Sequence, residues 1–144
     1  MPSLIDALKP FANWALRLSL SATFLFHAWD KFDAWPSFPT WLAATAIVPA
    51  YPVPVAILVT VLEAVAGVGI IAGIFLGSTV TRLAALAVIP VMIGAIVRVH
   101  WSIGFNNIQI TADGAMTFPG WEFNLALLAM AVYFVIAGNN DSEG

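Results

Sequence analysis

The sequence contains no cysteine. This absence excludes disulfide bonds, covalently attached c-type haem, cysteine-ligated iron–sulfur clusters and thiol–disulfide relays within the chain. Any redox chemistry of the chain therefore requires a bound cofactor or a partner protein.

Charge is also scarce. Charged residues make up 9% of the chain, whereas a soluble protein carries about 25%. Hydrophobic residues reach 61%, and the mean hydropathy is +0.94. The chain lacks the polar surface that water requires, so we expect a lipid bilayer to surround it. Lysine and arginine form no cluster, so we expect no nucleic-acid partner.

Apolar residues are concentrated in four segments, and each is near the length of about 20 residues that crosses a bilayer. Proline and glycine stand at the joints between these segments. The pattern predicts an all-α integral membrane protein with a single domain over residues 1–144. Its four-transmembrane-helix bundle is expected at about residues 11–29, 55–76, 80–99 and 121–137.

The connections between the segments differ in length. Gly77-Ser78-Thr79 predicts a tight turn. The longer first connection contains a candidate interfacial helix at residues 41–48, and the longer last one contains a candidate hairpin turn at Asp113-Gly114. With four crossings, the two longer loops share one membrane face, called here the loop face, and the termini share the other, the terminal face. Pro90 predicts a kink inside the third helix.

Basic residues indicate the orientation. Lys9, Arg17 and Arg82 lie toward the terminal face, and Lys31 and Arg98 lie toward the loop face. An excess of lysine and arginine marks the cytoplasmic side of a membrane protein. The sequence therefore predicts cytoplasmic termini.

Glu63 is the deepest ionisable residue of the predicted spans. It lies at the edge of a stripe of small residues on the second helix, formed by Ala66, Gly69, Gly73 and Gly77. Such a stripe lets another helix approach closely, so we expect Glu63 to point into the bundle. Three roles stay open: a hydrogen bond to a facing arginine or tryptophan, a proton-accepting or quinone-binding carboxylate, and a contact to lipid or a partner.

Two arginines lie toward the terminal face. Arg17, two turns inside the first helix, can reach into the bundle and pair with an acid. Arg82 opens the third helix and is placed to extend to the lipid headgroups. A structural role is favoured over a catalytic one for both.

The predicted topology brings both histidines of the chain, His27 and His100, to the loop face together with Asp30 and Glu122. Two imidazoles with a carboxylate can bind a metal, and two imidazoles from facing helices can bind a haem axially. The same groups can hold a quinone headgroup or form a structural polar cluster. The residues alone leave these alternatives open, and we assign no residue to a metal.

Tryptophan is unevenly distributed. An interfacial aromatic belt explains tryptophan near the headgroups, but a belt on both faces would be more even. A cap of aromatic loops over an apolar pocket is the alternative. The loop face holds Trp29, Trp35, Trp41, Trp101 and Trp121, and the terminal face holds Trp14.

Several motifs together resemble the DoxX family. The segment 17–31, RLSLSATFLFHAWDK, is similar to the family's first-helix signature, although Ala28 replaces the usual glycine after the histidine. The later similarities are Glu63 to Gly67 with Gly73, Gly77 and Arg82, then Met92, Ala95 and His100, and finally Gly120-Trp121-Glu122.

The resemblance implies a four-helix protein of a bacterial plasma (inner) membrane. It also implies a subunit for quinone-linked electron transfer, similar to thiosulfate:quinone oxidoreductase or to an oxidative-stress complex. A membrane or extracytoplasmic redox protein is the expected partner, and a homo-oligomer is a further expectation. The absence of cysteine departs from any thiol-based version of this role. The family-like polar positions are Arg17, His27, Lys31, Glu63, Arg82, His100 and Glu122.

The leading hypothesis places a quinone near the loop face. His27, His100 and Glu122 would bind its oxygens, and Glu63 would relay protons. Haem is the alternative cofactor. The competing functions are a non-catalytic scaffold, which binds a larger complex through the glycine stripe or the aromatic loops, and a small transporter with Glu63 and Arg17 as an ion pair. The residues expected to contact the cofactor are Arg17, Lys31, Arg82, Trp29, Trp101 and Trp121.

Overall fold

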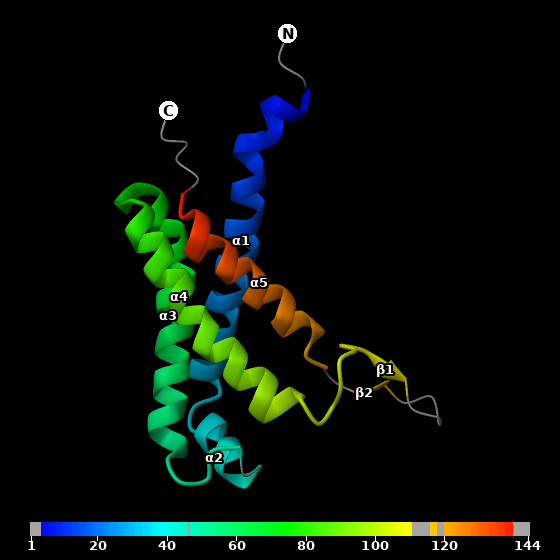
Figure 1. The fold of residues 1–144 in the computed structure, drawn as a ribbon. Helices are drawn as coiled ribbons and strands as arrows, with labels where there is room; N and C mark the ends of the chain where they lie inside the picture. The colour runs from blue at the N-terminus through cyan, green and yellow to red at the C-terminus, as the bar shows by residue number, and fades with distance from the viewer. Residues whose placement is uncertain (1–3, 46, 111–115, 118–119, 140–144) are drawn as a thin grey trace.

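The fold is helical apart from one small β-hairpin. The computed structural model describes residues 4–45, 47–110, 116–117 and 120–139. Within these residues the chain forms five α-helices, one π-helix and two short strands (Figure 1). In order they are α1 (Leu4–Asp33), α2 (Ser37–Ala44), α3 (Pro52–Leu76), α4 (Ser78–Gly94), the π-helix η1 (Ala95–His100), β1 (Gln109–Ile110), β2 (Met116–Thr117) and α5 (Glu122–Ala137).

The four predicted helices are α1, α3, α4 with η1, and α5, and they form a bundle. α3 packs against both α1 and α4, and α4 packs against α5, whereas α1 and α5 contact each other much less. The core between them is apolar. Its largest fully buried side chains include Leu20 and Phe24 of α1, Ile70 of α3, Val88 of α4 and Phe134 of α5.

The elements found at the two ends of the bundle are those that the sequence predicted. The start of α1 and the end of α5 lie at the same end of the bundle as the α3–α4 turn, and α2 lies at the opposite end (Figure 1). α2 begins a few residues before the predicted interfacial helix and packs against α3. β1 pairs with β2 in antiparallel register, Gln109 opposite Thr117. The predicted turn at Asp113-Gly114 lies outside the described residues.

Two of the four predicted spans pass the test of length and composition for crossing a membrane. Among the described residues they are α3, with mean hydropathy 2.5, and the continuous helix Ser78–His100, with mean hydropathy 2.2. α5 is apolar but has 16 residues, about 24 Å of helix, against a hydrocarbon core of about 30 Å. α1 carries Asn13 and Arg17 inside its apolar stretch. Membrane crossing by α1 and α5 stays a prediction.

Helix boundaries differ from the predicted ones where local signals were underestimated. α1 extends four residues beyond the predicted end, from Trp29 to Asp33. α3 starts at Pro52 rather than at residue 55, because proline has no N–H to lose in the first turn of a helix. α4 continues through Pro90 and is followed without a break by η1. In η1 each turn contains more residues than in an α-helix.

The distribution of polarity is the reverse of that in a soluble protein. The buried polar or charged side chains of the described residues are Arg17, Ser21, Glu63 and Thr81, and all of them lie on bundle helices. Large aliphatic and aromatic side chains cover the outside. In a bilayer, polar groups must find partners inside the protein. The pattern therefore supports the predicted lipid-facing surface.

The glycine stripe is the contact surface between α3 and α4. A Cβ added at Gly69 would lie 2.6 Å from the Cβ of Ala84, and one added at Gly73 would overlap the Thr81 side chain and lie 2.8 Å from its backbone nitrogen. Both distances are below the normal van der Waals limit. The stripe is therefore used within the chain and is covered by α4.

The other side of α3 meets α1 equally closely. A Cβ at Gly67 would lie 2.7 Å from Cγ of Leu25. The buried Ser21 hydroxyl of α1 donates a hydrogen bond to the carbonyl of Gly67. Small residues on α3 thus bring α1 and α4 to its two sides, which fixes the position of Glu63 between them.

Arg17 connects the helices at the terminal face. Its side chain is buried. Nη1 donates to the carbonyl of Ile70 in α3 at 2.7 Å and to the hydroxyl of Thr81 in α4 at 3.1 Å. Nη2 donates to the carbonyl of Gly138 at 3.1 Å and to Oδ1 of Asn139 at 2.7 Å. One guanidinium therefore joins α1 to α3, α4 and the end of α5.

Neighbouring groups hold this guanidinium in place. Nε donates to Oδ1 of Asn13 at 3.0 Å. The guanidinium carbon lies 4.9 Å from the ring centre of Phe134, a cation–π geometry. Asn139 donates through Nδ2 to the carbonyl of Gly73 at 2.9 Å, so the same network also fastens the end of α5 to α3.

Replacing Arg17 by lysine should destabilise the bundle although the charge is kept. Lysine cannot present planar N–H groups to several acceptors, so we expect the free energy of unfolding to fall by ~2 kcal/mol. Arg82→Lys is the matched control. Arg82 is exposed and reaches the carbonyl of Ile136 at 3.4 Å, and its replacement should change stability by less than ~0.5 kcal/mol. Unfolding titrations in mixed micelles measure both, and equal effects would contradict the role of Arg17.

Gly73→Ala should also destabilise the bundle, by ~1–3 kcal/mol, because the added methyl group overlaps Thr81. Gly94→Ala is the control, since nothing lies within 4 Å of an added Cβ at Gly94. The same unfolding titration compares the two alanine variants. A Gly73→Ala protein as stable as the Gly94→Ala protein would show that α3 and α4 are not in close contact.

Candidate functional site

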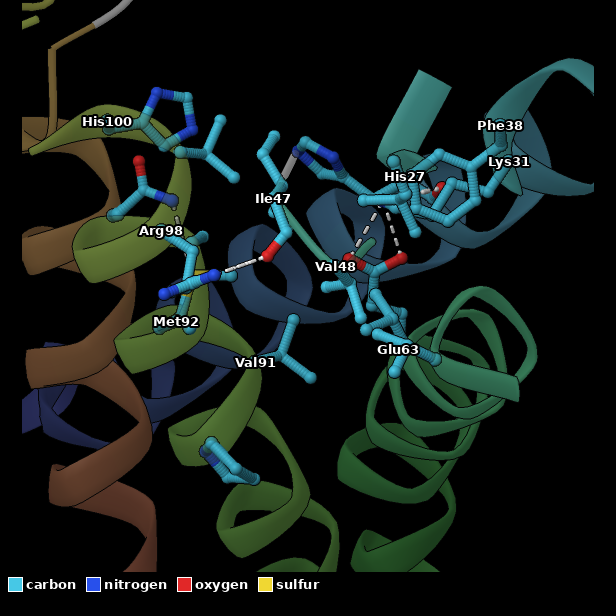
Figure 2. Close-up of a pocket in the computed structure, with 18 of the residues that line it drawn as sticks. His27, Lys31, Phe38, Ile47, Val48, Glu63, Val91, Met92, Arg98 and His100 are labelled. Atoms are coloured by element: carbon cyan, nitrogen blue, oxygen red, sulfur yellow. Dashed lines mark hydrogen bonds and ion pairs between the residues drawn. The ribbon is translucent and has the colours of Figure 1, made fainter. Parts of the chain in front are cut away.

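A pocket of about 620 Å³ lies between the helices toward the loop face. Its volume is in the range of cavities that hold small molecules, about 300–1,000 Å³. α1, α2, α3, α4 and η1 all contribute to its lining, and α5 contributes Asn124. Figure 2 shows the labelled side chains arranged around this space.

Most of the pocket wall is apolar. Aliphatic side chains come from α3, from α4 and from the segment between α2 and α3, and aromatic side chains come from α2. Such a wall suits a hydrophobic or aromatic ligand. The apolar lining residues include Phe38, Trp41, Leu42, Val48, Val55, Val59, Val91 and Met92.

A buried ion pair forms the polar end of the pocket. The Lys31 ammonium of α1 lies 2.9 Å from Oε1 and 2.8 Å from Oε2 of Glu63 in α3 (Figure 2). The Glu63 side chain is 3% exposed and that of Lys31 is 17% exposed. Lys31 also donates to the carbonyl of His27 at 3.3 Å and lies 5.5 Å from the ring centre of Phe38. Glu63 points into the bundle, as predicted, and its partner is a lysine from the helix next to it.

One oxygen of this pair has spare hydrogen-bonding capacity. Oε2 of Glu63 is buried and lies 2.8 Å from the Lys31 ammonium, which balances its charge. A carboxylate oxygen can accept more than one hydrogen bond. Because Glu63 lines the pocket, a bound molecule is a natural donor.

Arg98 holds the segment after α2 against the pocket. It is located on η1, and its Nε and Nη2 donate to the carbonyl of Ile47 at 3.2 and 2.7 Å (Figure 2). π-helical turns are frequent at functional sites. Asn124 of α5 directs its amide nitrogen at Sδ of Met92, 3.8 Å away. Both side chains line the pocket and stabilise its walls.

The structure brings together part of the predicted site. His27, Lys31, Glu63 and His100 all line the pocket. The helical continuation of α1 explains the contribution of Lys31, since residues four apart share one helix face. His27 and Lys31 therefore stand one above the other at the rim.

Other predicted residues lie elsewhere. Arg17 and Arg82 interact at the terminal face, at the opposite end of the bundle. Trp101 and Trp121 stack on each other with ring centres 5.9 Å apart, and neither is among the lining residues of this pocket.

Glu122 and Trp29 also lie outside the lining. Glu122 opens α5, and its backbone N–H donates to the carbonyl of Phe105 at 3.0 Å. Trp29 is exposed, with its ring centre 6.2 Å from that of Phe32.

Sequence reasoning missed Arg98, Phe38 and Asn124 as pocket residues. Arg98 was noted only as a basic residue of the loop face, although its position two residues before His100 was a usable signal. Phe38 belongs to α2, whose packing on α3 no sequence period reveals. Among the described residues, no three His, Asp or Glu side chains are placed to hold a metal ion.

Comparison with known proteins agrees with this picture. The model of the DoxX family matches residues 12–101, a range that runs from within α1 to the end of η1 and contains all of the pocket lining except Ile103 and Asn124. The match covers more than half of the chain, and the chain therefore belongs to the DoxX family of membrane proteins. No curated protein and no solved structure gives a significant match.

The Lys31–Glu63 pair should show strong coupling in a double-mutant cycle. Lys31→Met leaves a buried carboxylate without its counter-ion, so the free energy of unfolding should fall by ~3 kcal/mol. Lys31→Met combined with Glu63→Gln removes both charges and should recover most of that loss. Unfolding titrations of the wild type, both single variants and the double variant measure the coupling. Additive effects would mean that the ion pair does not contribute to the folded state.

Proposed function

We propose that the chain binds a quinone in this pocket and serves as a membrane subunit for quinone-linked electron transfer, of the thiosulfate:quinone oxidoreductase or oxidative-stress type. The observation that carries the proposal is an apolar cavity of about 620 Å³ between lipid-facing helices, closed at one end by a buried ion pair of Lys31 and Glu63.

The residues present fit a quinone. Its ring and isoprenoid tail need an apolar wall, which Val55, Val59 and Met92 supply. Its oxygens need polar partners, and these are concentrated where Lys31 and Glu63 meet. A membrane location also gives a lipid-soluble ligand direct access through the bilayer.

A bound quinone supplies a carrier for two electrons and two protons. In the chain, the Lys31 ammonium stabilises negative charge that develops beside it, and Glu63 accepts a hydrogen bond or a proton through Oε2. His27 is exposed and lines the same pocket. An imidazole at this position can pass protons between Glu63 and water. His100, on the η1 side, is a second candidate for a ligand oxygen.

The electrons come from another protein in this proposal. The chain has no cysteine, so its own residues provide neither a thiol relay nor cysteine ligands for an iron–sulfur cluster. A membrane or extracytoplasmic redox protein would then dock on the loop face of the plasma (inner) membrane, with the termini of this chain in the cytoplasm.

The scaffold function is the second candidate, and one observation favours it. Trp101 is 65% exposed and is stacked on Trp121, and Phe105 packs edge-on against Trp121 at 4.7 Å. Exposed aromatic clusters are typical of protein contacts. The glycine stripe does not serve this alternative, because α4 covers it.

Quinone analysis of protein extracted directly into lipid nanodiscs tests the proposal. Gly94→Leu places a side chain into open space in the pocket lining and should lower the copurified quinone about tenfold. Val97→Phe is the control, since Val97 is 58% exposed on the same helical stretch, and its quinone content should equal that of the wild type.

Other results would replace the proposal. A quinone-free wild type with a stoichiometric protein partner would establish the scaffold function. A Soret band in the absorption spectrum would establish a haem, with His27 and His100 as its candidate ligands.

A further inference from the structure

α5 is too short to cross a bilayer alone. Its 16 residues span about 24 Å, against a hydrocarbon core of about 30 Å. Figure 1 shows that α5 is also tilted relative to α3, and that it starts farther from the loop-face end of the bundle than α2 lies. A tilted helix covers less depth than its own length. The remaining depth is taken up either by a thinner bilayer or by the residues that precede α5.

The main chain before α5 has the pairing that a helix start inside lipid requires. The N–H groups of Gly120, Trp121 and Glu122 donate to the carbonyls of residues 104–106 at 3.0 to 3.1 Å. The first N–H groups of a helix have no partner within the helix, and in hydrocarbon no water takes that place. A helix that starts in water does not need such pairing. These bonds therefore allow α5 to begin below the membrane surface.

Gly120 makes the close pairing possible. It is buried, and an added Cβ would overlap the carbonyl oxygens of Phe105 and Asn106. Glycine is the residue that lets two main chains approach to this distance. Farther along the same connection, β1 pairs with β2, which adds main-chain hydrogen bonds within it.

The largest exposed side chains of this connection are apolar. Ile108 is 64% exposed and Ile110 is 70% exposed. Residues 102–120 contain no lysine or arginine, and their one charged residue is Asp113. Such a surface suits lipid acyl chains, and its contact with a bilayer requires no anionic headgroups.

From this combination we infer that α5 begins below the lipid headgroups and that the residues before it complete the fourth crossing, with Ile108 and Ile110 against lipid acyl chains. The stacked rings of Trp101 and Trp121 then lie at the boundary between headgroups and acyl chains, which is the depth that indole prefers. The inference rests on the membrane location of the chain and is independent of a quinone. It assigns the exposed surface before α5 to lipid, whereas the scaffold function assigns it to a protein.

Spin labels on single introduced cysteines test the inference, because the chain has no cysteine of its own. Ile108→Cys and Ile110→Cys are reconstituted separately in phosphatidylcholine vesicles. Electron paramagnetic resonance measures the ratio of label collisions with oxygen, which concentrates in hydrocarbon, to collisions with a water-soluble nickel chelate. Val65→Cys, exposed in the middle of α3, is the lipid reference. Asp33→Cys, exposed at the end of α1, is the water reference.

We expect the collision ratios at residues 108 and 110 to lie near the ratio of the lipid reference and well above that of the water reference. A ratio at either site equal to that of the water reference would overturn the inference, because the surface would then face water. Low collision rates with both reagents would also overturn it, because a second copy of the chain would then cover the surface.

Gly120→Ala, combined with Ile110→Cys, tests the main-chain pairing. The added methyl group separates residues 104–106 from the start of α5, and the freed N–H groups then require water. The ratio at residue 110 should therefore fall toward that of the water reference. Ser102→Ala, exposed in the same connection, is the matched control and should leave the ratio unchanged. An unchanged ratio in folded Gly120→Ala would refute the role of the pairing, and if this variant does not fold, the labels at residues 108 and 110 still decide the placement in lipid.

Discussion

The buried guanidinium of Arg17 is the interaction on which the rest of the bundle depends. α1 and α5 contact each other only slightly, so packing alone does not close the bundle between them. Arg17 closes it through hydrogen bonds to α3, α4 and the end of α5. In a lipid environment no water is available to replace these hydrogen bonds. The position of α1, and with it that of Lys31, follows from this anchor.

The chain separates two polar centres along α1. Arg17 and Lys31 are 14 residues apart in the sequence, about 21 Å along a helix, and each is held by groups on α3. Around Arg17 the guanidinium meets several oxygens at hydrogen-bonding distance, which is the arrangement of a structural site. Around Glu63 the ion pair lies beside a cavity, which is the arrangement of a binding site. Both centres are buried and charged, and they differ in that only the ion pair of Glu63 lines the pocket.

Length, apolar character and small residues were sufficient to predict the four bundle helices, the two longer loops at one end and the inward direction of Glu63. The pairing of Glu63 with Lys31 was not predicted, because the first helix was expected to end near Trp29 and Lys31 was assigned only to the loop face. Glu122 and the stacked tryptophans were grouped with the histidines because they share a membrane face. A shared face fixes depth but not direction around the bundle axis, and only packing decides which side chains reach the cavity. The contact from Arg98 to Ile47 is beyond sequence patterns, since its acceptor is a backbone carbonyl.

That contact also bears on which substitutions this chain can accept at residue 47. Arg98 holds residue 47 by its main chain, while the side chain of the same residue lines the pocket. Substitution at this position leaves the acceptor in place and alters only the shape of the wall. The contact to Arg98 thus depends on the main chain of residue 47, whereas the shape of the pocket depends on its side chain. Substitution at residue 47 can therefore change the shape of the pocket without a compensating change on η1.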